Sequence, residues 1–156
     1  MARDRFFRTI IGTLVFQRYE VHRIIRSTLH NSLVSERKVS PMRRIVEDLI
    51  RVEGVIGSLL VGKDGLVVAS TLLDEEDAEI LGAMSAAVFG EIDKATKRIG
   101  VGTLVDSIID AKDGSILLLE AKELILVVIT QRTVNLGLVK MEMRRAAKRI
   151  GEAVPI

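Results

Sequence analysis

The chain has 156 residues, of which 48% are hydrophobic and 28% are charged, a composition typical of a compact globular domain and not of a disordered chain. It contains no cysteine, so disulfide frameworks, thiolate metal sites and cysteine nucleophiles are excluded. It has only two histidines, His22 and His30, which is too few for a histidine zinc site and leaves few candidates for a catalytic histidine. The formal net charge is +2, and on composition alone we expect a soluble protein that is not an enzyme.

The charge is unevenly distributed along the chain. Residues 1–40 carry eight Lys or Arg against three Asp or Glu, a net charge of +5, whereas residues 41–156 have a net charge of −3. All aromatic residues except Phe89 precede position 20. We therefore predict a basic N-terminal extension over residues 1–40 and one globular domain over residues 41–156, with the boundary at Ser40-Pro41.

Apolar residues of the extension recur at helical spacing, which predicts one or two amphipathic helices. Its apolar run, residues 9–16, is far shorter than the roughly 20 residues that cross a bilayer. Several uses stay open: a helix that packs on the domain or on a partner, a helix on a membrane surface through residues 1–33, contact with nucleic acid, or a true start further downstream. For the protein as a whole we expect a cytoplasmic location, with peripheral membrane contact as the alternative, and no nucleic-acid partner.

The globular part is predicted to begin with a helix and a hairpin. Ser40-Pro41 is an N-cap followed by proline at the first helical position. Residues 55–61 and 66–70 read as two strands, and Asp64-Gly65 between them indicates a tight turn.

A long helix follows, with four acidic residues, 74–77, at its start and Gly100 after its end. One stripe of this helix is predicted to face the core: Leu81, Met84, Val88, Ile92, Ala95 and Ile99. A neighbouring stripe has only small residues, which would let another helix approach closely: Ala83, Ala86, Ala87 and Gly90.

Three strands are predicted next, over residues 103–109, 115–120 and 124–130. The six consecutive apolar residues 124–129 indicate a central strand covered on both faces. Asn135 is the predicted N-cap of a last helix, with Leu136, Val139, Met143, Ala146 and Ile150 facing inward. The order of elements predicts an α+β fold, a three-layer α/β/α sandwich around a five-stranded, mostly antiparallel sheet.

The sequence contains partial matches to nucleotide-binding and metal-binding or acid–base motifs, but none of them is complete. Residues 57–64 are one residue short of a P-loop, and Asp64 replaces the hydroxyl that would bind magnesium. Asp106 and Asp110 share a strand face but have no third ligand or base nearby. We therefore predict no catalytic, cofactor-binding or metal-binding residues and no cofactor.

The hairpin sequences Glu53–Val61 and Lys63–Ser70, the run Gly82-Ala83-Met84-Ser85-Ala86-Ala87, the strand 124–129 and Asn135-Leu136-Gly137 together resemble the Roadblock (dynein light chain) family. The resemblance spans about residues 41–152. It implies a generally non-enzymatic domain that dimerises, with the long helices antiparallel and the third strands joined into a ten-stranded sheet. The interface residues implied here are Ala83, Ala86, Ala87, Gly90, Thr103, Leu104, Val105, Asp106 and Ser107.

Prokaryotic members of this family commonly bind Ras-like small GTPases, as regulators or platforms. The hypothesis is thus a homodimeric adaptor of a Ras-like GTPase that works through surface complementarity, with Lys94, Lys97 and Arg98 as a contact for an acidic partner. Two alternatives are a small-ligand sensor module and a membrane-recruitment scaffold that uses the basic extension.

Overall fold

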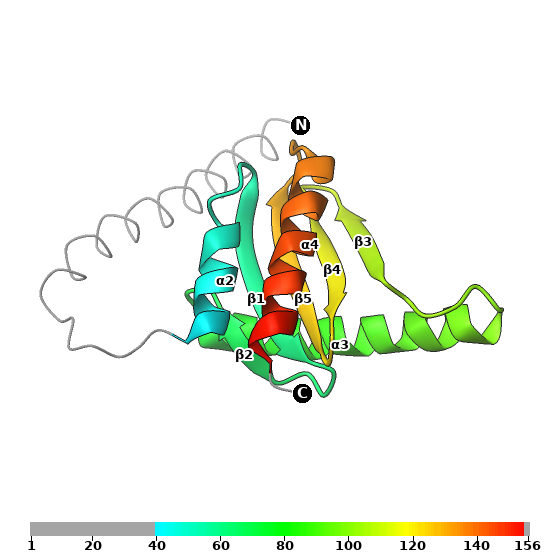
Figure 1. Cartoon of the computed structure of the whole chain (residues 1–156). Coiled ribbons are helices and arrows are strands. Elements are labelled where there is room, and N and C mark those ends of the chain that lie inside the picture. The colour runs from blue at the N-terminus through cyan, green and yellow to red at the C-terminus, as the bar shows by residue number, and fades with distance from the viewer. Residues whose placement is uncertain (1–39, 155–156) are drawn as a thin grey trace, which may run out of the picture. The chain divides into compact units, whose positions relative to one another are not determined.

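The computed structural model describes residues 40–154, so the predicted helices of the N-terminal extension lie outside the described residues. Helices and strands alternate in small groups along this part of the chain (Figure 1). Their order is α2 (Pro41–Leu49), β1 (Val55–Gly62), β2 (Val67–Ser70), α3 (Glu75–Arg98), β3 (Asp106–Ala111), β4 (Gly114–Ala121), β5 (Leu124–Gln131) and α4 (Leu136–Ala153).

The five strands form one sheet in the order β2-β1-β5-β4-β3, and every neighbouring pair is antiparallel. The first hairpin therefore adds beyond β5, which leaves β3 as a free edge. The four-residue strand β2 forms the other edge.

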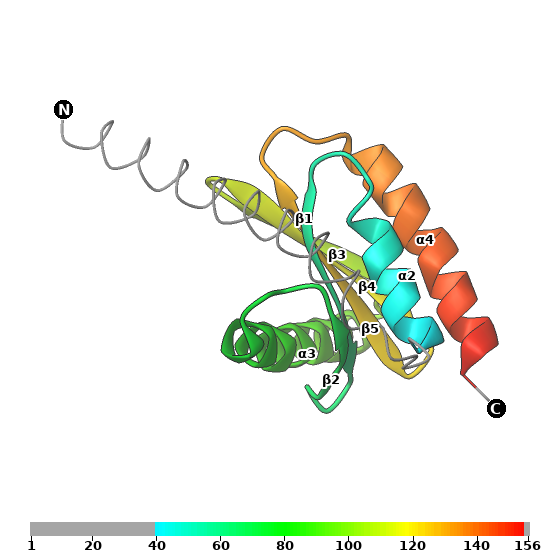
Figure 2. The same ribbon diagram turned by 90° about the vertical axis from the view of Figure 1, so that its left-hand side faces the viewer.

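Helices cover both faces of the sheet: α2 and α4 pack side by side on one face, and α3 lies across the other (Figure 2). The central strand β5 shows why both layers are needed. Its Leu126 and Val128 belong to the core under α2 and α4, whereas Ile125 and Val127 belong to the core under α3. The predicted three-layer α+β fold is confirmed, and four consecutive residues of the apolar run of β5, Ile125 to Val128, are fully buried.

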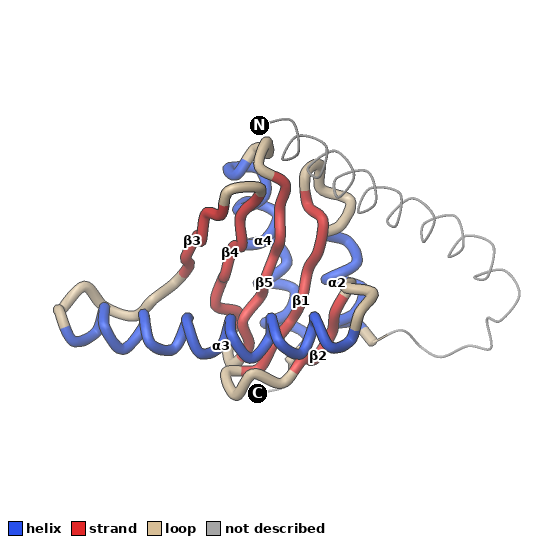
Figure 3. The backbone as a smooth tube through the Cα atoms, turned by 180° about the vertical axis from the view of Figure 1, so that it is seen from behind, coloured by secondary structure: helices blue, strands red, loops and turns tan. Residues whose placement is uncertain are grey.

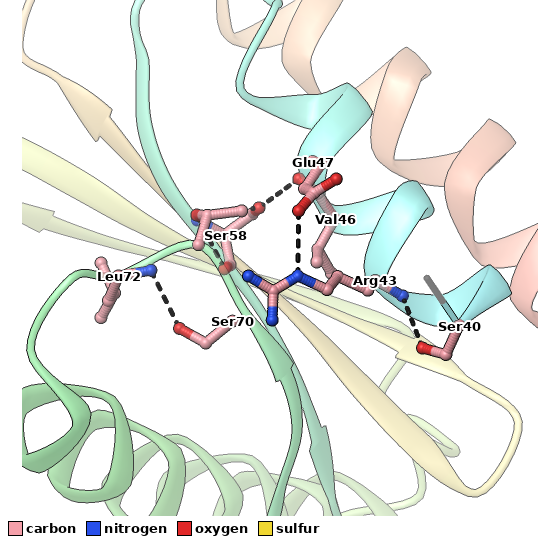
Figure 4. A network of polar contacts seen from close by, with 8 residues as sticks. Ser40, Arg43, Val46, Glu47, Ser58, Ser70 and Leu72 are labelled. Carbon is pink, nitrogen blue, oxygen red and sulfur yellow. Dashed lines mark hydrogen bonds and ion pairs between the residues drawn. The ribbon is translucent and has the colours of Figure 1, made fainter. Parts of the chain in front are cut away.

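A buried hydroxyl ties α2 to the sheet (Figure 4). The Ser58 side chain on β1 donates a hydrogen bond of 2.6 Å to the carbonyl oxygen of Val46, and the backbone N–H of Ser58 donates to the hydroxyl of Thr71 at 2.9 Å. At the start of α2, the Ser40 side chain accepts from the backbone N–H of Arg43 at 3.2 Å, which confirms the predicted N-cap.

The ends of the two longer helices also follow the sequence signals. Asp74 caps α3 by accepting from the backbone N–H groups of Glu76 and Asp77, and Asn135 caps α4 by accepting from Leu138. The predicted inward face of α4 is confirmed, since Val139, Met143, Ala146 and Ile150 are buried and Leu136 is half-buried against the same core.

The helix α3 crosses the sheet and continues beyond the β3 edge, and a loop then turns back into β3 (Figure 3). Among the described helices, none is both long and apolar enough to cross a membrane.

Candidate interaction surface

The helix α3 packs on the sheet through a different face from the one predicted. The buried positions of α3 are Ala78, Gly82, Ser85, Ala86 and Phe89. The predicted core stripe is wrong for most of its members: Leu81 is half-buried, but Met84, Val88, Ile92, Ala95 and Ile99 are exposed. We call Met84, Val88 and Ile92 the outer stripe.

Small side chains explain this orientation. A Cβ on Gly82 would lie 2.9 Å from the Cγ2 of Val67 and 3.5 Å from the Cγ1 of Val61, so the absence of a side chain lets the helix approach β1 and β2. Phe89 then supplies the one large buried side chain of the helix. Because an outward apolar stripe and an inward one have the same periodicity, the pattern alone could not distinguish them.

The small-residue stripe is used partly within the chain itself. Ala86 is buried in the core under α3, so it is not available to a partner. The Cα of Ala83 would lie 3.1 Å from a Cβ on Gly65, so the hairpin turn lies against the backbone of α3 at this position. Ala83 and Ala87 remain exposed, and nothing lies within 4 Å of a Cβ built on Gly90.

The strand β3 begins three residues later than predicted. Thr103, Leu104 and Val105 belong to the loop of residues 99–105, and only Asp106 and Ser107 of the predicted seam lie in β3. Gly100 and Gly102, which precede these residues, have φ values of +79° and +107°, so the first part of the loop turns and is not extended. The loop carries three strongly exposed apolar side chains: Ile99, Val101 and Val105.

The outer edge of β3 has no strand beside it, and the two isoleucines in its middle are half-exposed on opposite faces of the sheet. Ile108 pairs with Leu117 of the core under α4, and Ile109 pairs with Ile116, which packs against the core under α3. An uncovered strand edge with apolar side chains on both faces is a site for pairing with another strand.

The three cations predicted to contact an acidic partner lie near the end of α3. Lys94 forms an ion pair of 2.7 Å with Glu91, which raises the pKa of its ammonium group, and Lys97 forms one of 2.7 Å with Asp93. Within the described residues, Arg98 makes no ion pair. Of the three, the unneutralised charge of Arg98 is therefore the one most available to a partner.

The two carboxylates of β3 are engaged by neighbouring elements. Asp106 accepts from the Lys140 ammonium of α4 at 3.0 Å, and Asp110 accepts from the Ser115 hydroxyl at 2.5 Å. A hollow of about 10 Å³ lined by α4, β3 and β4 is barely large enough for one water molecule. In the part of the chain that is described, we find no cluster of three or more residues able to hold a metal ion.

The comparison with protein families and curated proteins gives one consistent result. The family model described as the Roadblock/LC7 domain matches residues 43–130. The Methanocaldococcus jannaschii protein MJ1340 is 47% identical over 107 residues, which are 69% of this chain and 94% of that protein. A second protein of that organism, MJ0714, is 45% identical over 111 residues, 71% of this chain and 94% of its own length.

Solved structures show the same fold at lower identity. Myxococcus xanthus MglB superimposes with a TM-score of 0.68 at 19% identity over 74% of this chain and 95% of its own. A Roadblock/LC7 domain from Streptomyces avermitilis gives 0.67 at 21%, covering 69% and 92% of the two chains. An MglB in a tetrameric arrangement gives 0.66 at 22%, covering 78% and 94%.

Proposed function

Because the chain belongs to the Roadblock/LC7 domain family, we propose that it is a non-enzymatic, homodimeric adaptor that regulates a Ras-like small GTPase. The observation that carries this proposal is a series of exposed apolar residues along one part of the chain. It runs from the outer stripe of α3 through the 99–105 loop and into the free edge of β3. Exposed apolar surface of this extent indicates a protein contact.

A second copy of the chain fits this surface. In a two-fold dimer the same patch faces itself, so an apolar stripe on one α3 meets the equivalent stripe on the other. The acidic start of α3 and the basic residues near its end also favour antiparallel helices, because opposite charges then approach each other. The helix contact consists of the outer stripe together with Ala83, Ala87 and Gly90, while Ala86 supports it from the core.

The strand seam is the free edge of β3, with Asp106 and Ser107 at its start, and pairing of two such edges gives a ten-stranded sheet. The loop residues Thr103, Leu104 and Val105 flank this seam and do not extend it. Pairing satisfies the outward backbone groups of β3. It also brings the part of α3 that extends beyond β3 under the partner's sheet, where Ile109 offers a half-exposed apolar contact.

A GTPase is proposed as the partner because prokaryotic members of the Roadblock family commonly bind Ras-like small GTPases. The adaptor would act by binding one nucleotide state of the GTPase more tightly, because only differential affinity shifts an equilibrium. We place the cations Lys94, Lys97 and Arg98 in this contact, with the Arg98 guanidinium as the leading contact for an acidic surface of the GTPase.

Binding of Ras-like GTPases from the same genome, each loaded with GDP or a non-hydrolysable GTP analogue, tests the proposal by calorimetry. We expect one GTPase to bind with an affinity that depends on the nucleotide, and Arg98→Glu to weaken that binding. The control is Arg145→Glu on α4, an exposed arginine in the opposite layer, whose 2.8 Å ion pair with Glu142 lies within its own helix. Lack of binding by every GTPase in both states would refute the partner class.

A further inference from the structure

The backbone of the 99–105 loop is held in place at its start. The N–H of Val101 donates a hydrogen bond of 2.9 Å to the carbonyl oxygen of Thr96, and the N–H of Gly100 donates to Lys97 at 3.1 Å. These bonds satisfy the last carbonyl groups of α3, and the positive φ of Gly100 permits the turn. The loop therefore leaves the helix in one defined direction.

Asp93 fixes Leu104, near the end of the loop, to the side of α3. Its Oδ1 accepts the backbone N–H of Leu104 at 2.9 Å, and its Oδ2 accepts the Lys97 ammonium at 2.7 Å. Both bonds stabilise the ionised carboxylate and lower the pKa of Asp93, the bond from Lys97 more strongly. The side chain of Leu104 packs into the core under α3. Hence Leu104 is anchored by its backbone and by its side chain.

Asp106 fixes the end of the loop to the opposite layer. Its carboxylate accepts from Lys140 of α4 at 3.0 Å and lies 3.7 Å from the Arg144 guanidinium. One residue earlier, the carbonyl oxygen of Val105 accepts the backbone N–H of Glu120 in β4 at 3.0 Å. The start of β3 is thus tied to α3 through Asp93 and to α4 through Asp106.

Although its backbone is anchored, the loop exposes three apolar side chains to water. The residues Ile99 and Val101 are 73% and 74% exposed, and Val105 is 62% exposed. Ordering a loop costs conformational entropy, and holding three apolar side chains in water recovers none of it. A fixed backbone that displays such side chains is therefore suited to a preorganised contact with another molecule.

We propose that Asp93 and Asp106 are positioning residues of the self-association surface, a role that rests on the homodimer proposed above. Asp93 holds the 99–105 loop against α3, and Asp106 holds the first residue of β3 against α4. Together they keep the loop's apolar side chains and the free edge of β3 in the one arrangement that a second copy can meet. Neither carboxylate needs to touch the partner.

The test measures loop order and self-association separately in the full chain. Backbone amide exchange is followed by NMR at a concentration where the protein is monomeric, and the dimer dissociation constant is measured by sedimentation. In Asp93→Ala, we expect exchange at Leu104 to rise about tenfold and the dissociation constant to rise about tenfold, since a hydrogen bond to a charged group is lost. We expect Asp106→Ala to weaken the dimer by a similar factor.

Two further variants separate positioning from general damage. In Asp93→Asn, the amide oxygen can still accept from Leu104, so we expect exchange there to stay near the wild-type rate and the dimer to be weakened less than in Asp93→Ala. Glu91→Gln removes a matched ion pair of the same helix that does not touch the loop, and we expect neither readout to change.

Three results would overturn the proposal. Exchange at Leu104 that stays within twofold in Asp93→Ala would show that the carboxylate does not hold the loop. A loosened loop with an unchanged dissociation constant would reject the positioning role while leaving the homodimer intact. A wild-type protein that remains monomeric at about 100 µM, well above typical dissociation constants, would refute the homodimer itself and this role with it.

Discussion

Truncation of Ile92 on the outer stripe of α3 separates the proposed interface from the core. Its side chain is 44% exposed, so 44% of its surface remains to be covered by a second copy. Complete burial of an isoleucine is worth about 1.5–3 kcal/mol, which gives about 1 kcal/mol for this fraction and about 2 kcal/mol for the two copies in a symmetric dimer. We therefore expect Ile92→Ala to weaken self-association about thirtyfold.

The assay is sedimentation velocity over a dilution series, with urea unfolding of the monomer as the check on folding. The matched control is Met141→Ala, because Met141 is 43% exposed but lies on α4, in the opposite layer. We expect the control to dimerise like the wild type. Equal weakening in both variants, or no weakening in Ile92→Ala, would refute the assignment of the outer stripe to the interface.

Further predictions concern stability. Ser58→Ala leaves the buried carbonyl of Val46 without its 2.6 Å partner and should lower the free energy of unfolding by about 1–2 kcal/mol in urea titrations; an unchanged midpoint would contradict this. Gly114→Ala places a Cβ against a backbone carbonyl of β5 and should destabilise the fold by about 1–3 kcal/mol, measured by thermal unfolding and disproved by a wild-type melting temperature. The pKa of Asp93 is lowered in the folded chain, chiefly by Lys97, so its stabilising contribution is complete above the unfolded value of about 4 and is lost as the pH falls through the lower folded value. Asp93→Asn should therefore flatten the loss of stability below about pH 4, and an identical acid profile would count against the ion pair.

Local signals were sufficient to predict most of the architecture. The caps at Ser40, Asp74 and Asn135, the turn at Asp64-Gly65 and the run of β5 each act within a few residues, and the structure confirms them. The layering followed as well, since a β5 buried on both faces requires helices in both layers, whereas the strand order was seen only in the structure.

The face of α3 was not predictable in the same way. Its sheet-facing positions include Gly82, Ser85 and Ala86, whereas the outer stripe has larger apolar residues such as Val88 and Ile92. A rule that turns the most apolar stripe inward therefore selects the wrong side. A helix that packs on its own core with one face and on a partner with another carries apolar residues on both faces. The contrast between its polar and apolar faces is then weak.

The start of β3 was misplaced for a different physical reason. Leu104 and Val105 have the composition of a strand, but the carboxylate of Asp93, eleven residues earlier, accepts the backbone N–H of Leu104 and holds this segment against α3. The ion pair that holds the start of β3 against α4 joins Lys140 and Asp106, which are 34 residues apart in the chain. No local pattern could have brought either pair together.

Amide hydrogen exchange of the two sheet edges at low and high protein concentration tests the central claim most directly. The account predicts that the outward N–H groups of β3 become protected as the concentration rises, while those of β2 at the opposite edge exchange at the same rate throughout. Exchange of β3 that is independent of concentration, or protection that appears at β2 instead, would contradict it.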